Sequence, residues 1–595
     1  MAGWLGIMVM CMCCQVSVAR SVTVDMAGYG VKPGGGKNLS GKLQKALTRI
    51  RKDYAGDEVT LRFQPGRYEF HPEGSARREY YISNHDQTNP KSVALTIEGW
   101  DNVTVDGCGA DFIFHGRMLP VAVVGSKHVT LRGFHIDFAV PHISQAEVVG
   151  NDSENGMVLR LAPYVDAVVE NHGLVTRGEG WRIAPRMGIA FDGESGRVIW
   201  NTGDVWCGLD SVVAEPGGLW RAPAWNDARL KPGSVIALRN GERPAPAIFL
   251  HGDAGTVIED VKVHYAEGMG VLAQLCDSVA LRGFGVCRRG EDDPRLFTTQ
   301  ADATHFSGCK GLISSVDGLY EGMMDDAINV HGTYLRVTER TDSRTVHARY
   351  MHDQSYGFMW GEPGDTVSVV RSRVMEPLEE TFVIESIRAL DSPARGWEIR
   401  FTAELPAEVS EQELFGLENL TWSPEVLFAR NVVRNNRARG SLFSTPRRTV
   451  VEENLFDHTS GAAILLCGDC MGWFETGACH DVLIRRNRFV NALTSLYQFT
   501  EGVISIYPVI YDIDGQRGYF HSGIVIEENS FEMFDAPLLY ARSVDGLRFS
   551  GNRVTWNHDY KPFHHNRFNF RLERVRNLTI ENNVLGTESP SVRID

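Results

Sequence analysis

The chain has 595 residues, of which 43% are hydrophobic, so it is long enough to bury a large core and too apolar to be intrinsically disordered. Its formal net charge is −15 and it has no long basic run, which argues against binding to nucleic acid or to an anionic membrane. The 60 glycines and the scarcity of helical periodicity favour β-structure with many bends.

An apolar run of 11 residues opens the chain at positions 4–14 and is followed by the small residues SVA at 17–19. Such a run is too short to span a bilayer, and the small residues suit a cleavage site. Residues 1–19 are therefore expected to be a secretory signal peptide, and the mature protein is expected to be periplasmic or secreted. Cysteines within the run leave a lipoprotein as the less favoured alternative.

Residues 20–141 are expected to form a cap and the first coils of a solenoid. Apolar residues recur at helical spacing behind a possible capping residue at Asn38 or Ser40, and a strand with a Pro-Gly turn follows at 58–70. An amphipathic helix that leads into such a turn resembles the cap of pectate-lyase-type β-helices. A cap is needed because an open coil edge would pair with other chains. The apolar positions of the helix are Leu39, Leu43, Ala46, Leu47 and Ile50.

A bend motif recurs along the chain: apolar alternation, two polar residues, Asn, any residue, and an apolar residue. Asn tolerates left-handed backbone, and its amide can bond to the coil above or below. Earlier copies, at 128–137 and 277–286, use Gly at the bend. The prediction is an all-β protein with a right-handed parallel β-helix, since a β-sandwich would not repeat a bend motif. The bend residues are Asn431, Asn454, Asn487, Asn529, Asn552 and Asn582, at separations of 23, 33, 42, 23 and 30.

Two segments interrupt this pattern with longer alternating strands, at 142–245 and at 333–424. Each contains a Pro-Gly turn that leads into an apolar strand ending in Arg, so both are predicted to be small, related β-barrels. Coils are expected at 246–332, between the insertions, and at 425–595.

Three carboxylates stand out just before the second insertion. Asp325 and Asp326 are adjacent, and Asp302 lies 23 positions before Asp325. One coil takes ~20–30 residues, so Asp302 is expected one coil below the pair and on the same face. Packed carboxylates repel, which raises the pKa of at least one and leaves an acid beside bases. This combination suits the cleavage of a glycosidic bond, with no cofactor and no metal.

Each aspartate also has a structural interpretation, as a turn residue, a bend cap or a solvated side chain. Calcium binding by the carboxylates is a further alternative. Cys467, Cys470 and Cys479 have spacings that could suit zinc, but Cys467 ends an apolar strand and is expected in the core. In an exported protein, Cys470 and Cys479 could instead form a disulfide.

A sugar site also needs an aromatic platform and polar groups. Tyr356, Trp360 and Glu362 in the second insertion, and His331 at the end of the strand after the aspartate pair, are the candidates for substrate binding. Trp360 is equally well explained as part of the barrel core.

At these residues the chain resembles two families. The arrangement TxxAD…DDAIN is similar to the site of polygalacturonases, and the match is closer to the glycoside hydrolase family 110 α-1,3-galactosidases, over nearly the whole chain. That resemblance implies inserted barrels, Asp325 as the general acid, Asp302 and Asp326 as the carboxylates that activate water, and Glu362 as a further acidic group in the pocket. It also implies that terminal α-1,3-linked galactose is removed, as from blood group B and linear α-galactosyl epitopes.

Charge favours a neutral sugar over galacturonate. The segment after the aspartate pair, NVHGTYLRV, lacks the Arg-x-Lys element of polygalacturonases, and the whole chain is acidic. A calcium-dependent polysaccharide lyase and a non-catalytic glycan-binding β-helix remain alternatives. The sequence does not decide between linear and branched substrates, nor does it indicate the oligomeric state.

Overall fold

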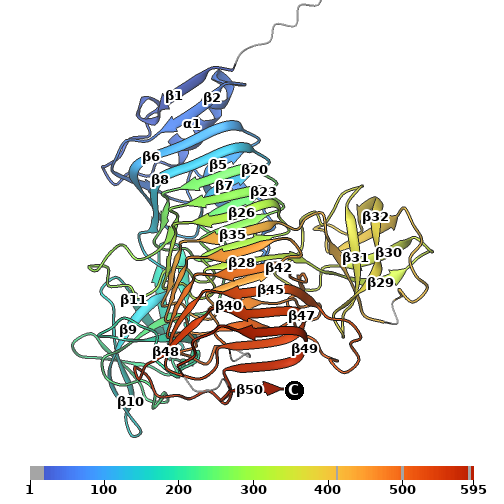
Figure 1. Ribbon diagram of the computed structural model, residues 1–595. Helices are drawn as coiled ribbons and strands as arrows, with labels where there is room; N and C mark the ends of the chain where they lie inside the picture. The colour runs from blue at the N-terminus through green and yellow to red at the C-terminus, as the bar shows by residue number, and fades with distance from the viewer. Residues whose placement is uncertain (1–18, 411–412, 498–501, 587–590) are drawn as a thin grey trace, which may run out of the picture.

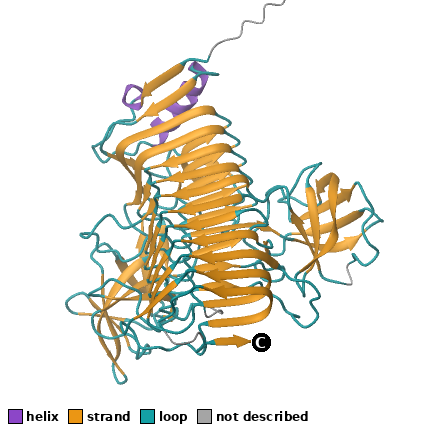
Figure 2. Ribbon diagram, in the orientation of Figure 1, coloured by secondary structure: helices purple, strands orange, loops and turns teal. Residues whose placement is uncertain are grey.

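The computed structural model describes residues 19–410, 413–497, 502–586 and 591–595 (Figure 1). It is a parallel β-helix from which two β-domains project, as the stack of strands in Figure 2 shows. The predicted signal peptide and the alternative lipoprotein cysteines lie outside the described residues, apart from Ala19. No helix within the described ranges is long and apolar enough to cross a membrane.

Each coil contributes up to three strands, and each strand pairs in parallel with its counterpart in the next coil. The first sheet contains β5 (Lys91–Glu98), β7 (Leu119–Val124), β19 (Ile248–His251), β22 (Val271–Gln274), β25 (Thr304–Ser307), β28 (Ile328–Thr333), β37 (Ser441–Ser444), β40 (Ile464–Leu466) and β44 (Ile504–Ile506). The second contains β20 (Ala254–Glu259), β23 (Asp277–Arg282), β26 (Lys310–Val316), β35 (Glu425–Ala429), β38 (Thr449–Glu452), β42 (His480–Arg485) and β45 (His521–Glu527). The third contains β21 (Lys262–Val263), β24 (Gly285–Val286), β27 (Leu319–Glu321), β36 (Val432–Arg434), β39 (Leu455–Asp457), β43 (Arg488–Val490), β46 (Ser530–Met533) and β48 (Arg553–Trp556).

The two ends of the solenoid differ. At the N-terminal end, helix α1 (Ser40–Asp53) covers the core with the apolar face that its spacing predicts, and Leu43, Leu47 and Ile50 are buried. Near it the short strands β1 (Ser21–Asp25) and β2 (Glu58–Arg62) pair with each other, and β2 pairs with β6 (Asp101–Phe114). The long strands β6 and β8 (Lys127–Phe138) pair along their length, and β8 continues from the second sheet into the third. The C-terminal coils end with β47 (Leu539–Ser550), β49 (Phe570–Glu581) and β50 (Val592–Ile594).

A ladder of buried asparagine side chains joins the C-terminal coils. The backbone N–H and the side-chain amide of Asn454 both donate to Oδ1 of Asn487, at 3.0 and 2.9 Å, and the pattern repeats from coil to coil. The bend motif predicted Asn582 as the last residue of this series. In the structure Asn583, one position later, accepts the hydrogen bonds from Asn552. Asn582 instead adopts the left-handed backbone at the bend, with φ of 55°. The ladder residues are Asn431, Asn454, Asn487, Asn529, Asn552 and Asn583.

The first insertion forms a seven-stranded antiparallel sheet with a separate three-stranded sheet beside it, and the pairing of the seven strands does not close into a ring. Its large sheet consists of β9 (Ser144–Asp152), β10 (Gly156–Leu161), β14 (Met187–Asp192), β15 (Val205–Trp206), β16 (Val213–Glu215), β17 (Leu219–Ala222) and β18 (Ser234–Arg239). The small sheet consists of β11 (Asp166–Glu170), β12 (Gly173–Gly178) and β13 (Trp181–Ile183).

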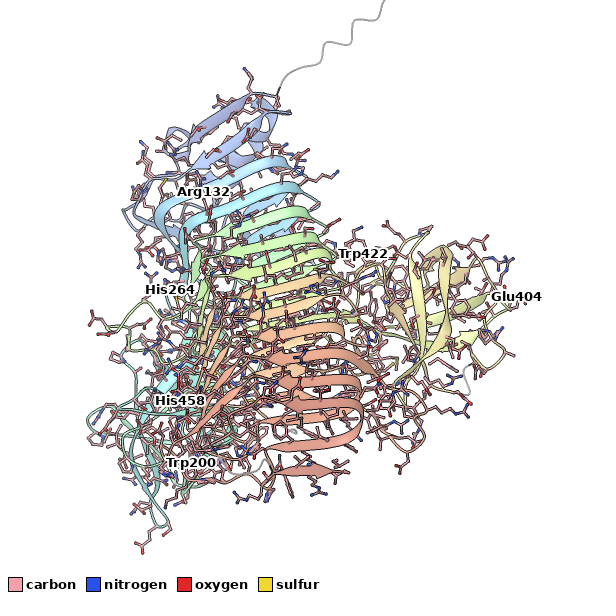
Figure 3. The ribbon with its side chains drawn as sticks, in the orientation of Figure 1. Arg132, Trp200, His264, Glu404, Trp422 and His458 are labelled. Atoms are coloured by element: carbon pink, nitrogen blue, oxygen red, sulfur yellow. The ribbon has the colours of Figure 1, made fainter. Side chains whose placement is uncertain are left out.

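The second insertion is a closed six-stranded barrel with its own apolar core. It projects to the right of the coils in Figure 1, and Figure 3 labels Trp422 where the barrel meets them. The Nζ atom of Lys310, on β26, lies 4.2 Å from the centre of the Trp422 ring. The barrel strands are β29 (Leu335–Arg340), β30 (Thr345–Arg349), β31 (Thr366–Arg371), β32 (Glu376–Ala389), β33 (Gly396–Phe401) and β34 (Phe415–Asn419).

Candidate active site

Two of the three aspartates stack in register along the solenoid. Thr304 of β25 pairs with Ile328 of β28, and Ile328 pairs in turn with Ser441 of β37. Asp302, Asp326 and Arg439 each lie two residues before one of these positions, so they occupy the same site in three consecutive coils. The backbone N–H of Ala303 donates to the carbonyl of Asp326 at 2.7 Å, which fixes this register.

Asp325 lies beside this stack and faces three guanidinium groups. Its Oδ2 is 3.2 Å from Nη2 of Arg243 and 3.8 Å from Nη1 of Arg437, and its Oδ1 is 3.6 Å from Nη2 of Arg439. Asp326 is fully buried, and Arg439 donates to both of its carboxylate oxygens. Asp325 lines a pocket, whereas Asp326 supports its floor.

The three carboxyl groups differ in their electrostatics. Burial, together with the charge of Asp325, raises the pKa of Asp302 to about 8. Burial also raises the pKa of Asp326 to about 8, against the opposing effect of Arg439. For Asp325, burial is outweighed by Arg437, Arg439 and Arg243, and the pKa lies below its usual value.

The three aspartates offer oxygen atoms that lie within 4.8 Å of one another, a spacing that could hold a cation. The neighbouring arginines already supply positive charge here, and Arg439 occupies both oxygens of Asp326. The donor set therefore favours an arginine-compensated carboxylate cluster over a metal site.

The pocket above the aspartates has a volume of about 120 Å³. Its wall combines apolar side chains with carboxylates, amides and the exposed ring of Trp473, which stacks on His352 at 4.4 Å. This mixture suits one sugar ring, because an aromatic face covers the C–H side of the ring while polar groups meet the hydroxyls. The lining includes Asn84, Arg243, Met269, Asp302, His305, Asp325, Asn329, Arg439, Leu442, Leu465, Asp469, Trp473, Glu475 and Val509.

A chain of hydrogen bonds leads away from Asp302. Its Oδ2 lies 2.6 Å from Nδ1 of His305, and Nε2 of His305 lies 2.7 Å from Nε2 of His331. The Nε2 atom of His331 is also 3.4 Å from Oε1 of Glu475, on β41 (Glu475–Thr476). Both imidazoles are buried, so the chain is shielded from bulk solvent.

The other residues predicted to bind substrate are not brought to this pocket. Trp360 lies in the barrel core and donates from its indole N–H to the carbonyl of Thr333 at 2.8 Å. Tyr356 packs against Arg395, and Glu362 is exposed beside the barrel. His331 lies near the site but is buried behind His305 and does not line the pocket.

Several site residues were missed because their sequence signals are weak. Arg437 and Arg439 belong to the short segment RARG, which lies beyond the second insertion. Arg243 lies at the end of the first insertion, and Trp473 and Glu475 lie between Cys470 and Cys479, where the cysteines are the stronger sequence signal. The segment after the aspartate pair has no Arg-x-Lys element, but arginines reach the site from other segments of the chain.

The cysteines in that loop are free thiols. The Sγ of Cys470 lies 3.0 Å from Oγ of Ser372, and Cys479 donates to the carbonyl of Phe443. Cys467 borders the catalytic pocket. Within the described residues, the groups of three or more potential metal ligands contain no cysteine.

A parallel β-helix with three carboxylates at the floor of a small, aromatic-walled pocket defines the class of β-helix glycoside hydrolases. Comparison with known proteins gives the family. Residues 144–236 match the family model described as GLAA-B beta-barrel domain I, and residues 345–414 match GLAA-B beta-barrel domain II.

Curated relatives cover almost the whole chain. Alpha-1,3-galactosidase B of Phocaeicola vulgatus is 57% identical over 577 residues, 95% of this chain and 97% of its own length. Alpha-1,3-galactosidase B of Bacteroides fragilis is 54% identical over 572 residues, 94% of this chain and 96% of its own. The corresponding protein of Akkermansia muciniphila is 38% identical over 569 residues, 95% of this chain and 70% of its own. The chain therefore belongs to the glycoside hydrolase family 110 α-1,3-galactosidases.

Solved structures give more distant similarities. The A-module of an Azotobacter vinelandii mannuronan C-5 epimerase is 11% identical, with a TM-score of 0.41, and the match covers 95% of this chain and 100% of that one. An exopolygalacturonase of Thermotoga maritima is also 11% identical, with a TM-score of 0.38, over 95% of this chain and 92% of that one.

Proposed function

We propose that the protein is an exo-acting, inverting glycosidase that removes terminal α-1,3-linked galactose from blood group B glycans, and from linear Galα1-3Gal epitopes if its pocket accepts them. The carboxylate cluster at the floor of the pocket carries this proposal. The shared name of the relatives supplies the linkage and the sugar.

The size of the pocket supports exo action. A cavity of about 120 Å³ suits the ring of one terminal sugar rather than the interior of a chain. Leu442, Leu465 and Val509 on one side and Asn84 and Asn329 among the polar groups give it the two kinds of surface that a sugar ring needs.

In the proposed reaction Asp325 gives its proton to the glycosidic oxygen, while Asp302, which lines the pocket, takes a proton from the attacking water. Asp326, buried below the pocket, contributes through its contact with Arg439. In the free protein the arginines favour the ionised form of Asp325. A sugar that fills the pocket would remove water from this carboxyl group and raise its pKa, which favours the protonated form in the complex.

The geometry also supports a second division of roles. One oxygen from each of the three aspartates lies within 4.8 Å of the others, which is close packing for a site that must hold a water between acid and base, since the carboxyl groups of inverting enzymes are typically ~6.5–9.5 Å apart. An ionised Asp325 could then act as a nucleophile with Asp302 as the acid, and the anomer released distinguishes the two schemes.

The arginines raise the question of an anionic substrate such as galacturonate. Each one is already matched by a carboxylate: Arg243 contacts Asp325, and Arg437 donates to Asp204 at 2.8 Å. Arg439 is likewise matched by Asp326. No pocket arginine in the described part of the chain is left to pair with a substrate carboxylate, so a neutral sugar remains favoured.

Incubation of the purified protein with Galα1-3Gal, with the fucosylated B trisaccharide and with polygalacturonate tests the proposal. Free galactose from the B trisaccharide is expected, and no reducing ends from polygalacturonate. Release of galacturonate, or no galactose from either α-1,3-linked substrate, would reject it. Export to the periplasm or the medium belongs to the same proposal and is tested by cell fractionation.

A further inference from the structure

His305 and His331 extend from Asp302 in a chain of hydrogen bonds that ends at a backbone carbonyl oxygen. The hydrogens in this chain can be assigned by starting from that oxygen. The Nδ1 atom of His331 lies 2.6 Å from the backbone carbonyl of Gly332, and a carbonyl oxygen only accepts hydrogen bonds. His331 must therefore carry a hydrogen on Nδ1.

Two more contacts lie between His331 and the pocket. Each of the contacts His331–His305 and His305–Asp302, at 2.7 and 2.6 Å, also needs one hydrogen. Three contacts thus require three hydrogens. Two neutral imidazoles supply two, so Asp302, His305 and His331 together hold one further proton and are neutral as a group.

From this geometry we propose that His305 and His331 are positioning residues that relay a proton from Asp302 to the His331 imidazole, where the Glu475 carboxylate stabilises the charge. The inference rests on the proposed function and deepens it, because it assigns a route by which the buried Asp302 is freed to act as a base.

The transfer needs only two hydrogens to move, each across its own hydrogen bond. The O–H bond of Asp302 breaks and an N–H bond forms at Nδ1 of His305, while the Nε2–H bond of His305 breaks and an N–H bond forms at Nε2 of His331. Each atom that loses a hydrogen keeps the electron pair. The result is an Asp302 carboxylate in the pocket and a His331 imidazolium, 3.4 Å from the Glu475 carboxylate.

In turnover, the Asp302 carboxylate takes a proton from the attacking water as the new C–O bond forms. Once the pocket opens to solvent, the proton taken from water leaves Asp302 and the two hydrogens return along the chain. The His331 imidazolium therefore exists only during the attack, beside the carboxylate of Glu475, which lines the pocket and is 14% exposed. Oε1 of Glu475 also accepts from the amide of Asn84 at 3.0 Å, which holds the carboxylate towards the imidazole.

Charged groups around the chain bias the position of the proton. Buried surroundings keep the pKa of His305 well below its usual value and raise that of Asp302, so the resting proton belongs on Asp302. The titratable and charged groups that face the chain are His85, Arg243, Asp325, Asp326, Arg439 and Glu475.

Replacement by glutamine tests the relay, because glutamine can donate and accept hydrogen bonds but cannot pass a proton. His305→Gln and His331→Gln are expected to lower kcat on the B trisaccharide by on the order of 10²-fold, with little change in KM and a shifted pH profile. His521→Gln is the matched control, since His521 is equally buried but lies on β45, and it should leave kcat and the pH profile unchanged. Values of kcat within about threefold of wild type in both relay variants, or a rise in KM alone, would overturn the relay.

A second measurement does not depend on activity or on the variants folding. In wild-type protein labelled with ¹⁵N-histidine, the ring spectra at neutral pH should show His331 protonated at Nδ1, with the His305–His331 hydrogen strongly deshielded. An unprotonated Nδ1 at His331 would overturn the hydrogen count. If the wild type releases no galactose but shows this ring pattern, the proposed function fails while the hydrogen count stands.

Discussion

Arg439 donates from Nε and Nη2 to the carboxylate of Asp326, at 2.9 and 2.7 Å, across 113 positions of sequence that include the whole second barrel. The two residues are nevertheless neighbours in consecutive coils. The floor of the pocket is thus completed by chain from both sides of an insertion.

Arg439→Leu is expected to destabilise the protein by ~3–5 kcal/mol, because it leaves the fully buried Asp326 without its counterion. Urea denaturation at pH ~9, above the pKa of about 8 of the Asp326 carboxyl group, measures the loss. Arg430→Leu is the control: Arg430 pairs with Asp317 on the surface, where an ion pair contributes ~0–1 kcal/mol. Equal effects of the two substitutions would contradict the role of Arg439.

Asp325→Asn should be folded but should lose ~10²–10⁴-fold in kcat on the B trisaccharide, because it removes the proton donor while preserving shape. An aryl galactoside with a good leaving group should be affected less. Asp317→Asn, at an exposed carboxylate that pairs with Arg430 and does not line the pocket, should remain active. Activity of Asp325→Asn within about tenfold of wild type would reject the assignment.

Hydrolysis should release β-galactose first, since the proposed reaction inverts the anomeric centre. Proton NMR of the first-formed product, recorded before mutarotation, distinguishes the anomers. If α-galactose appears first, the reaction retains the anomeric configuration and Asp325 is the nucleophile. The close spacing of the carboxylates would then reflect direct attack by Asp325 on the sugar.

Activity should persist in EDTA, because guanidinium groups rather than a cation balance the aspartates. Galactose release is measured after dialysis against chelator, with and without added calcium. Complete loss that calcium restores would favour a metal-dependent reaction at the triad.

Asp302→Asn should change how stability depends on pH. The carboxyl pKa is about 8 in the folded protein and ~3.9 in an unfolded chain, so its contribution to stability is present at low pH and is lost as pH rises towards 8. An asparagine amide donates to His305 at every pH. The variant should therefore gain stability relative to wild type between pH ~4 and ~8, by up to ~1.4 kcal/mol per pH unit. Parallel stability curves for the two proteins would show that Asp302 does not hold this proton.

The aspartate cluster could be predicted from the sequence because adjacent coils convert a spacing of 23 or 24 positions into a contact. The same reasoning could not find Arg439, since the coil repeat gives no partner across a 113-residue interval. Trp360 was predicted to bind substrate from its residue type alone, but its side chain is buried in the core of the barrel. At the last bend, two consecutive asparagines fit the motif equally well, and only the hydrogen bond from Asn552 separates them.

The closed second barrel leaves the solenoid after β28 and returns before β35, and it keeps its own apolar core. The free-energy cost of closing a flexible loop grows only with the logarithm of the loop length, by ~0.6 kcal/mol for each doubling. Such a side branch can lengthen, shorten or be exchanged at small thermodynamic cost while coil pairing keeps the pocket floor intact. None of the described barrel residues lines the pocket, so the barrel and the pocket floor are in this way free to evolve at different rates.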